Sequence, residues 1–276
     1  MVPDFLVIGA QRSGTTWLHR VLQQHPDLWL TPVKELHYFD KPDIRFGVLD
    51  ADERRRARFW ELKRFARNPR WYTRYWFLPR SDAWYGRLFA PGRRLGRRVG
   101  EITPAYATLE RPVWEHIHAL APELKLVFVM RDPVVRVWSA IRNRVRKGQF
   151  DADAAVAALL EQARLPGSVA RSDYLGTIER VEAVFGVQAL HCCFFEQLTS
   201  EPAELAESLF RFLGVPPLGE ALKLPPATNV AAGGDKAPLA FQWEMARDYL
   251  PMVERLAERF GPVPAGWAER YHRLLA

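Results

Sequence analysis

The stretch that decides the fold is residues 4–16, which read DFLVIGAQRSGTT. Residues 4–8 contain an apolar run of the kind that forms a buried strand. Gly9 and Gly14 then bound a short loop, and residues 15–24 carry apolar side chains at helical spacing. A strand, a glycine-containing loop and a helix N-terminus make an anion site, because unbonded N–H groups and the positive helix end face the ligand. We therefore expect this loop to bind a phosphate-like group.

The loop differs from the nucleotide-triphosphate loop G-x-x-x-x-G-K-[ST] at an informative position. Gly9 and Gly14 have its four-residue gap, but Thr15 stands where that loop has Lys, and the basic residue is Arg12. No apolar strand ends in a clear magnesium-binding Asp, since Asp132 lies between an Arg and a Pro. A clamp for β- and γ-phosphates is therefore poorly supported. A plain tight turn into a helix is the alternative interpretation.

Two further apolar runs, residues 125–130 and 189–195, predict interior strands, and helical patterns follow both. Strands that alternate with helices indicate a parallel sheet covered on both faces. We expect an α/β fold with a central parallel sheet of about four or five strands. The absence of repeats and low-complexity linkers predicts one domain over residues 1–276.

Two regions have other patterns. Residues 40–100 have no strong strand signal, so we expect irregular structure and short helices there. Residues 238–275 predict helices that are broken at Pro251 and again at residues 261–264.

The composition is that of a globular protein. The chain has 276 residues, 48% of them hydrophobic, and a formal net charge of +7, which excludes a disordered, collagen-like or disulfide-scaffold chain. The basic excess is local, because residues 54–98 carry 15 Lys and Arg against two acids. Cys192 and Cys193 are neighbours, which rarely pair, and we expect them in the core. No apolar run could span a membrane and the N-terminus enters a strand directly, so we expect a cytoplasmic protein.

A second motif follows the strand at residues 125–130 and occupies residues 131–139, RDPVVRVWS. Arg131 ends a predicted parallel strand, where open α/β sheets bind ligands. Ser139 lies two turns into the next helix, which can fold back beside the strand. An Arg fork and a Ser hydroxyl suit a terminal phosphate. On these residues alone, an Arg at the sheet edge and a Ser on a helix surface are an equal alternative.

Together these motifs resemble the sulfotransferases that use 3′-phosphoadenosine 5′-phosphosulfate (PAPS). The first loop is similar to their 5′-phosphosulfate loop, and residues 131–139 are similar to their 3′-phosphate motif R-D-P-x-x-R-x-x-S. Further stretches resemble the branch of heparan-type carbohydrate sulfotransferases and their bacterial relatives. These are His25-Pro26, residues 34–40 (KELHYFD), Trp84-Tyr85 with Leu88-Phe89, residues 100–106 (GEITPAY), residues 172–174 and residues 195–198. Order and spacing fit over residues 4–236.

The resemblance implies a P-loop-like sulfotransferase fold and in-line transfer of a sulfuryl group from PAPS to a hydroxyl of a small-molecule, carbohydrate or secondary-metabolite acceptor. It implies no metal, because Arg and backbone donors hold the leaving phosphate. Arg12 stands where heparan-type members usually carry Lys, which leaves the acceptor class open. The implied cofactor-binding residues are Arg12, Ser13, Gly14, Thr15, Thr16, Trp17, Arg131, Ser139 and, from a later loop, Gly234 and Lys236.

Glu35 is the general base that the resemblance implies, with Lys34 and Arg12 as positive charges beside the transferring group. The cytosolic small-molecule branch has a His near the position of Thr103-Pro104, and this chain has none there. A free Glu is a weak base at neutral pH, so it needs a raised pKa or a strongly coupled transition state. An exposed charged turn is the alternative, with His37 and Glu101 as reserve candidates for the base. Substrate contacts are expected from His37, Tyr38, Glu101, Tyr106 and Tyr174.

Residues 54–80 interleave Arg with aromatic side chains, which could stack bases. In the resembled family this region contributes to the acceptor cleft, so an anionic or aromatic acceptor and a solvated helix are equal alternatives. We expect no nucleic-acid or membrane partner. The other functions considered are a nucleotide-dependent kinase that uses the same loop and a non-catalytic nucleotide or nucleic-acid binder.

Overall fold

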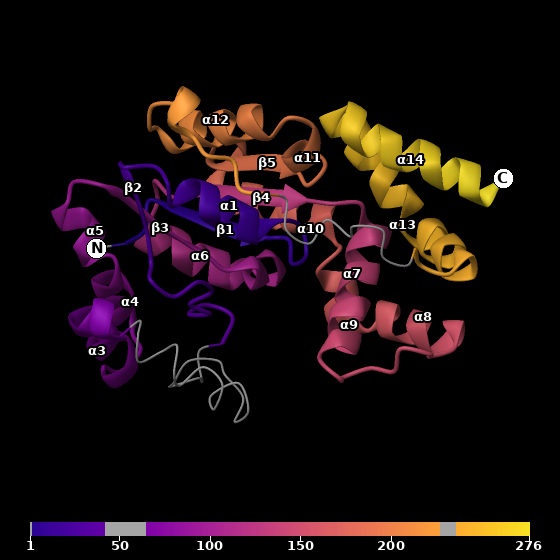
Figure 1. Cartoon of the computed structure of the whole chain (residues 1–276), viewed down its shortest axis with the longest axis horizontal. Coiled ribbons are helices and arrows are strands. Elements are labelled where there is room, and N and C mark those ends of the chain that lie inside the picture. Colours follow the sequence, from indigo (N-terminus) through magenta and orange to yellow (C-terminus); the bar gives the residue numbers. More distant parts are fainter. Residues whose placement is uncertain (1, 42–64, 227–235) are drawn as a thin grey trace.

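The computed structural model describes residues 2–41, 65–226 and 236–276. At its centre lies a five-stranded parallel sheet with the order β2-β3-β1-β4-β5 (Figure 1). The strands are β1 (Phe5–Gly9), β2 (Leu28–Leu30), β3 (Arg98–Ile102), β4 (Lys125–Met130) and β5 (Leu190–Phe194). The predicted α/β fold with four or five parallel strands is confirmed.

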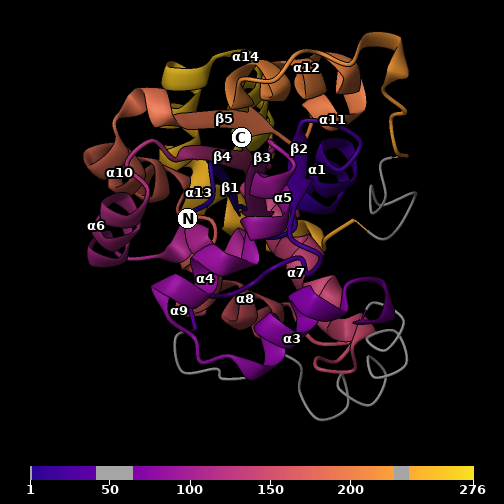
Figure 2. The same ribbon diagram turned by 90° about the vertical axis from the view of Figure 1, so that its left-hand side faces the viewer.

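Helices cover both faces of this sheet. Figure 2 shows α6 and α10 on one side and α1 and α12 on the other. The α-helices are α1 (Thr15–Leu22), α3 (Pro69–Phe77), α4 (Asp82–Leu88), α5 (Ala90–Arg94), α6 (Arg111–Leu120), α7 (Pro133–Arg146), α8 (Val156–Arg164), α9 (Pro166–Ala170), α10 (Tyr174–Phe185), α11 (Gln197–Ser200), α12 (Pro202–Leu213), α13 (Leu239–Phe260) and α14 (Pro262–Leu275). Short 3₁₀ helices are η1 (Pro104–Thr108), η2 (Val187–Ala189) and η3 (Gly219–Ala221).

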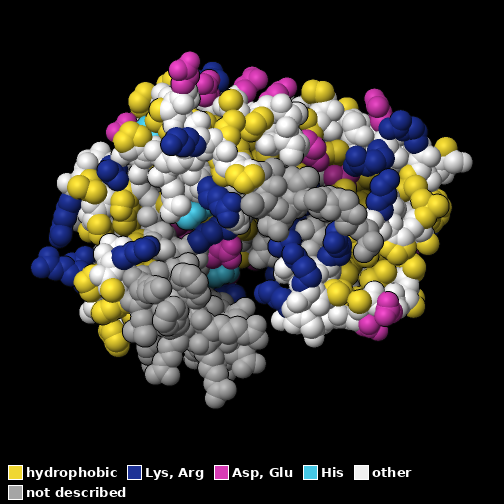
Figure 3. All heavy atoms as spheres, viewed as in Figure 1, with side chains coloured by type: hydrophobic (Ala, Val, Ile, Leu, Met, Phe, Trp, Pro, Cys, Tyr) yellow, Lys and Arg dark blue, Asp and Glu magenta, His cyan; other side chains and the backbone are white. Residues whose placement is uncertain are grey.

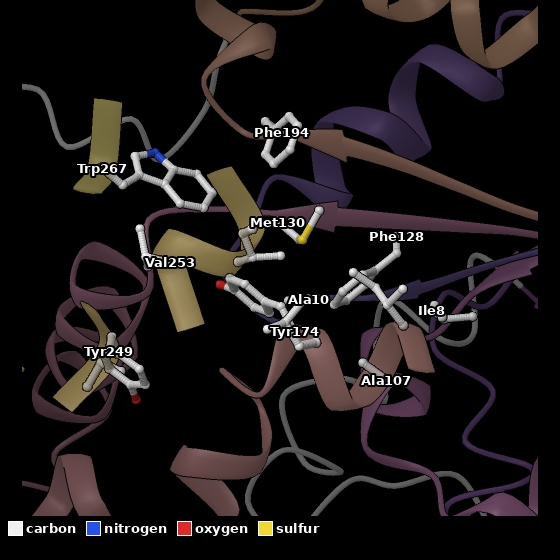
Figure 4. Packing of buried hydrophobic residues seen from close by; sticks show 14 of the residues in the cluster. Ile8, Ala10, Ala107, Phe128, Met130, Tyr174, Phe194, Tyr249, Val253 and Trp267 are labelled. Carbon is white, nitrogen blue, oxygen red and sulfur yellow. The ribbon is translucent and has the colours of Figure 1, made fainter. Parts of the chain in front are cut away.

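The core has two layers because side chains alternate along each strand. Leu6 and Ile8 of β1 point into the layer formed with α6, α10 and α13. Phe5 and Val7 point the other way, toward α1 and α12. Figure 4 shows Phe128 and Tyr174 packed together in the first layer, where their rings meet edge to face at 5.7 Å. Burial on both faces explains why β1 and β4 are continuous apolar runs.

Two strands were not located from the sequence. For β3, the expectation of only irregular structure and short helices at residues 40–100 was wrong, although the short helices α3, α4 and α5 do lie there. β2 has three residues, and β3 falls partly within residues 40–100. β3 has no apolar run because it carries Gly100 and the buried carboxylate of Glu101. Gly100 leaves room for a neighbour, since a Cβ there would lie 2.5 Å from the Phe5 ring.

A break in the C-terminal helix was predicted at Pro251, and this prediction was wrong. Pro251 lies on the exposed side of α13, which runs unbroken from Leu239 to Phe260. The buried side chains of Tyr249 and Val253 flank it and hold the helix against the core. The predicted break at residues 261–264 is confirmed at Gly261, where φ is 76° and α14 begins.

The order of the strands determines where a ligand can bind. From β1 the chain first builds β2 and β3 on one side, and then crosses to β4 and β5 on the other. The connections on the two sides of β1 therefore diverge at its carboxyl end, which opens a crevice of the kind that binds ligands. No helix in the described part of the chain is long and apolar enough to cross a membrane.

Candidate active site

The loop between β1 and α1 is shaped by close packing under it. A Cβ at Gly9 would lie 2.8 Å from Ala107, and one at Gly14 would lie 2.5 Å from Leu198. Gly14 has φ 91°, and Arg12 adopts the left-handed region at φ 70°. No side chain caps the N-terminus of α1. Its first N–H groups therefore remain available to an anion.

A cleft of about 460 Å³ lies over this loop. The hollow in the face shown in Figure 3 has Lys and Arg side chains on both sides. Four basic side chains and one carboxylate line the cleft, so it attracts anions. The lining residues are Gln11, Arg12, Gly14, Thr15, Thr16, Trp17, Lys34, Glu35, Pro104, Arg131, Ser139, Asn143, Lys147 and Phe195.

The two predicted phosphate motifs meet in the cleft through direct contacts. The Arg12 Nε donates to Ser139 Oγ at 3.2 Å, and Arg131 Nη1 donates to the Arg12 carbonyl at 3.0 Å. The Arg131 guanidinium also stacks on the Phe195 ring at 4.0 Å. Burial, then the charges of Arg146 and Arg131, lower the pKa of Arg12. The cations are thus crowded together, and a bound anion would relieve their repulsion.

The loop at residues 34–40 forms the opposite wall with a chain of ionic contacts. The Lys34 Nζ lies 3.3 Å from both Thr16 Oγ1 and Glu35 Oε1. Glu35 Oε2 lies 3.5 Å from His37 Nε2, and His37 Nδ1 lies 2.7 Å from Asp40 Oδ2. Both ring nitrogens of His37 thus face carboxylates, which is the environment of a doubly protonated imidazolium.

These contacts shift the pKa values of Glu35 and His37 in the direction that favours the charged form of each side chain. Burial lowers the pKa of His37, but the hydrogen bonds to Asp40 and Glu35 outweigh burial and raise it to about 9. Burial raises the pKa of Glu35, but the hydrogen bond from His37 and the charge of Lys34 outweigh it and lower the pKa. At neutral pH, Glu35 is therefore a carboxylate and His37 a cation.

Glu101 supports this loop from behind. It is fully buried and accepts hydrogen bonds from Leu36 N at 3.3 Å and Thr103 Oγ1 at 2.7 Å. Its other oxygen accepts from the Tyr85 hydroxyl at 2.7 Å and the Tyr106 hydroxyl at 3.0 Å. Burial raises its pKa despite these bonds. Glu101, on β3, therefore links Tyr85 of α4 and Tyr106 of η1 to the backbone N–H of Leu36, the residue after Glu35.

The same loop contains two residues in the left-handed region, where most side chains cost free energy. Glu35 has φ 64° and His37 has φ 51°. The intervening backbone is held by Glu101, and the Tyr38 N–H donates to the Tyr106 hydroxyl at 3.0 Å. The alternating conformation turns Glu35 toward the cleft, while the Tyr38 ring stacks on Tyr85 at 4.7 Å on the other side.

The structure brings together most of the residues predicted to bind the cofactor or to act in catalysis. In the cleft lining are Arg12, Gly14, Thr15, Thr16, Trp17, Lys34, Glu35, Arg131 and Ser139. Ser13 is fully buried beside them, and its Oγ has no partner in the described part of the chain. Lys236 is exposed and does not line the cleft, and Gly234 lies outside the described residues.

The predicted substrate contacts are placed differently. Glu101, Tyr106 and Tyr174 have no exposed surface, so they cannot touch a substrate in this conformation. They support the site instead, since the Tyr174 hydroxyl donates to the Arg131 carbonyl at 2.8 Å. His37 lies next to Glu35, and the Tyr38 hydroxyl donates to Asp82 at 2.8 Å, away from the cleft.

Several lining residues escaped the sequence reasoning. Asn143 and Lys147 follow Ser139 at four-residue intervals along and just beyond α7, so they lie on the same side of the helix. This spacing could have identified them. Phe195 had appeared only as part of a motif, and nothing in the sequence indicates that its ring stacks on Arg131. Asp40 was also part of a motif without an assigned role.

Comparison with known proteins places this site in a family. The sulfotransferase family profile matches residues 3–219. The human protein named heparan sulfate glucosamine 3-O-sulfotransferase 6 is 30% identical over 146 residues, 52% of this chain and 31% of that protein. Rat carbohydrate sulfotransferase 15 is 23% identical over 318 residues, 96% of this chain and 54% of that protein. The chain thus spans between about a third and about half the length of these relatives.

A solved structure supports the fold. The crystal structure of a sulfotransferase from Alicyclobacillus acidocaldarius superposes with a TM-score of 0.67 at 23% identity, covering 97% of this chain and 99% of that one. In the described part of the chain, no group of three or more His, Cys, Asp or Glu side chains is placed to hold a metal ion. The profile match extends over most of the sequence and contains both walls of the cleft. The chain belongs to the sulfotransferase family.

Proposed function

We propose that this chain transfers a sulfuryl group from PAPS to a hydroxyl group of a carbohydrate or small-molecule acceptor. The observation that carries the proposal is the meeting of Arg12, Arg131 and Ser139 in one cationic cleft at the carboxyl end of β1. The names of the human and rat relatives, which refer to glucosamine and carbohydrate, favour this acceptor class.

The donor set of the cleft fits PAPS. PAPS carries anionic groups at both ends of its nucleoside, and it supplies the sulfuryl group when bound. Arg131 and Ser139 would hold the 3′-phosphate with a guanidinium and a hydroxyl. Arg12, Thr15 and Thr16 would hold the 5′-phosphosulfate with the N-terminus of α1. The Ser13 hydroxyl is unpartnered in the described part of the chain but has no exposed surface, so it could donate to the phosphosulfate only if the loop shifted on binding.

Glu35 is the proposed general base. Its lowered pKa keeps it ionised at neutral pH, so it can accept the proton of the acceptor hydroxyl. As that proton moves to Glu35, the acceptor oxygen bonds to sulfur and the bond from sulfur to the 5′-phosphate oxygen breaks. Lys34, 3.3 Å from Glu35 and from Thr16, would neutralise charge on the leaving phosphate. A carboxylate with a lowered pKa is a weak base, so this transfer requires a partly broken bond to the leaving group.

The nucleotide-dependent kinase is not favoured. The family match is to sulfotransferases, and Thr15 occupies the position of the Lys that clamps terminal phosphates in kinase-type loops.

Isothermal titration calorimetry with adenosine 3′,5′-bisphosphate tests the donor site. The bisphosphate is expected to bind at least about tenfold more tightly than adenosine 5′-phosphate, because a charge-assisted hydrogen bond to the 3′-phosphate is worth that much. Arg131→Met should abolish the difference, whereas Arg142→Gln, on the same helix but outside the cleft lining, should retain it. Transfer of labelled sulfate from PAPS to a panel of hydroxylated acceptors then tests the reaction. Absence of bisphosphate binding would overturn the proposal.

A further inference from the structure

A second cavity, which we call the α7–α9 cavity, adjoins the cleft. It has a volume of about 380 Å³ and shares Gln11, Arg12 and Asn143 with the cleft lining. A molecule in this cavity therefore reaches the side of the loop where Arg12 lies. Its lining residues are Gln11, Arg12, Arg136, Ala140, Ile141, Asn143, Arg144, Gln162, Leu165, Gly167, Ser168 and Arg171.

The charge in the α7–α9 cavity is one-sided. Four of its lining residues are arginines and none is acidic. Arg144 is exposed at its rim, and Arg171 is half-buried. Burial, then the charge of Arg136, lower the pKa of Arg171, while the charge of Asp40 raises it. Asp40 is the facing carboxylate, and it is already bound to His37 at 2.7 Å.

Arg136 is the unusual member of this set. Only 1% of it is exposed, and its Nε and Nη2 donate to Ser172 Oγ at 2.7 Å and the Ser168 carbonyl at 3.2 Å. Both partners are neutral. Within residues 2–41, 65–226 and 236–276, no carboxylate lies within 4.0 Å of its guanidinium. Buried guanidinium groups are normally paired with an anion, so this charge is left without compensation.

The other lining groups suit the body of a small organic molecule. Ala140, Ile141 and Leu165 supply apolar surface. The side-chain oxygen of Gln162 is buried and accepts no hydrogen bond in the described part of the chain. A hydroxyl group of a ligand could donate a hydrogen bond to it. An anionic group with an apolar or hydroxylated body therefore matches the cavity better than an inorganic ion alone.

We propose that the α7–α9 cavity binds a carboxylate, sulfate or phosphate ester on the acceptor, so that the preferred acceptors are anionic hydroxyl compounds. Arg136 and Arg171 bind the anionic group, and the acceptor hydroxyl extends past Arg12 into the cleft. Because it names the acceptor class of the same site, this inference rests on the proposed function.

Matched acid and amide pairs test it, because each pair differs in charge and hardly in shape. The probes are 4-hydroxyphenylacetate with 4-hydroxyphenylacetamide, and D-glucuronate with D-glucuronamide. Each probe is titrated calorimetrically into protein saturated with adenosine 3′,5′-bisphosphate, so that the result does not depend on turnover. We expect the acids to bind about 10- to 100-fold more tightly than the amides, the range of a hydrogen bond to a charged group. With PAPS, kcat/KM should show the same preference.

Variants locate the effect. Arg171→Gln should reduce the ratio of acid to amide affinity by about tenfold relative to the wild type, the worth of one charge-assisted hydrogen bond, and Arg144→Gln, at the rim, should reduce it by a smaller factor. Arg142→Gln, on α7 but outside both linings, should leave it unchanged. Because Arg171 is partly exposed and Arg144 is exposed, we expect both variants to fold.

The outcomes separate the two proposals. Equal binding of acid and amide, or no binding of either acid, would overturn the anion subsite even if sulfate transfer is observed. A preference that survives Arg171→Gln and Arg144→Gln would also overturn it. Failure to bind adenosine 3′,5′-bisphosphate would overturn the proposed donor site, and the titrations without nucleotide would then decide on the α7–α9 cavity alone.

Discussion

Replacement of His37 by Gln should remove a large part of the pH dependence of stability between pH 6 and pH 10. The pKa of His37 is raised from 6.5 to about 9 by Asp40 and Glu35, against the opposing effect of burial. A group with a raised pKa stabilises the fold below its unfolded value, and this stabilisation is lost as the pH rises through the folded value. The stabilising window for His37 therefore closes between pH 6.5 and about pH 9.

The magnitude follows from the two pKa values. Each tenfold change in proton affinity corresponds to about 1.4 kcal/mol, so the imidazolium contributes about 3 kcal/mol at pH 6 and nearly nothing at pH 10. The free energy of unfolding is measured by urea denaturation at intervals over this range. The difference in this free energy between the wild type and His37→Gln should be about 3 kcal/mol larger at pH 6 than at pH 10. Glu35, whose pKa is lowered, stays ionised throughout this range, so its own titration does not interfere.

Asp40→Asn is the matched variant. It removes the hydrogen bond of 2.7 Å and its charge but leaves Glu35 in place, so the pH-dependent difference should fall to roughly half. His37→Gln can also lower the free energy of unfolding by a constant amount at every pH, because packing around the side chain is lost. If the difference between wild type and His37→Gln stays constant from pH 6 to pH 10, the imidazolium assignment is refuted.

Three further predictions concern the site. Glu35→Gln should lower kcat by about 10²- to 10⁴-fold, the range of general base catalysis, with the affinity for adenosine 3′,5′-bisphosphate unchanged in calorimetry; a kcat near wild type would exclude Glu35 as the base. Glu101→Gln should cost about 1–3 kcal/mol in urea denaturation, because the amide replaces one of two accepting oxygens in a buried cluster, and it should lower kcat more than Thr177→Val, a buried control away from the loop; equal kcat losses would reduce Glu101 to a stability role. Sulfate transfer should continue at the same rate after dialysis against EDTA, whereas a loss restored by magnesium would show a metal requirement that the described residues do not indicate.

The sequence was most informative where a short segment carries both structure and chemistry. The first loop and residues 131–139 each combine a strand, a turn and a helix start, so local pattern alone predicted that they lie at the same edge of the sheet. The contact between Arg12 and Ser139 confirms that they meet. The loop residues Lys34 and Glu35 could be assigned only through resemblance, because an isolated charged pair has no structural signature.

The features that could not be predicted from the sequence depend on contacts between distant segments. β3 escaped because its pattern is broken by Glu101, whose burial is possible only when Tyr85 and Tyr106 come from elsewhere to bond it. The same contacts explain why Glu101 and Tyr106 were expected at the substrate, since a polar residue in a motif looks exposed until its partners are known. The α7–α9 cavity likewise depends on how the helices α7, α8 and α9 pack against the first loop, which no local pattern encodes.

The left-handed backbone at Glu35 has a consequence for how this protein can be engineered. Glycine adopts φ 64° without the cost of about 1 kcal/mol that other side chains incur there. A library randomised at position 35 and selected only for heat tolerance should therefore become enriched in Gly and Asn, and sequencing of the survivors would reveal it. The same library selected for sulfate transfer should retain Glu. Thermal robustness and turnover thus demand different residues at one position, so stabilisation of this loop by consensus or screening would remove the group on which the chemistry depends.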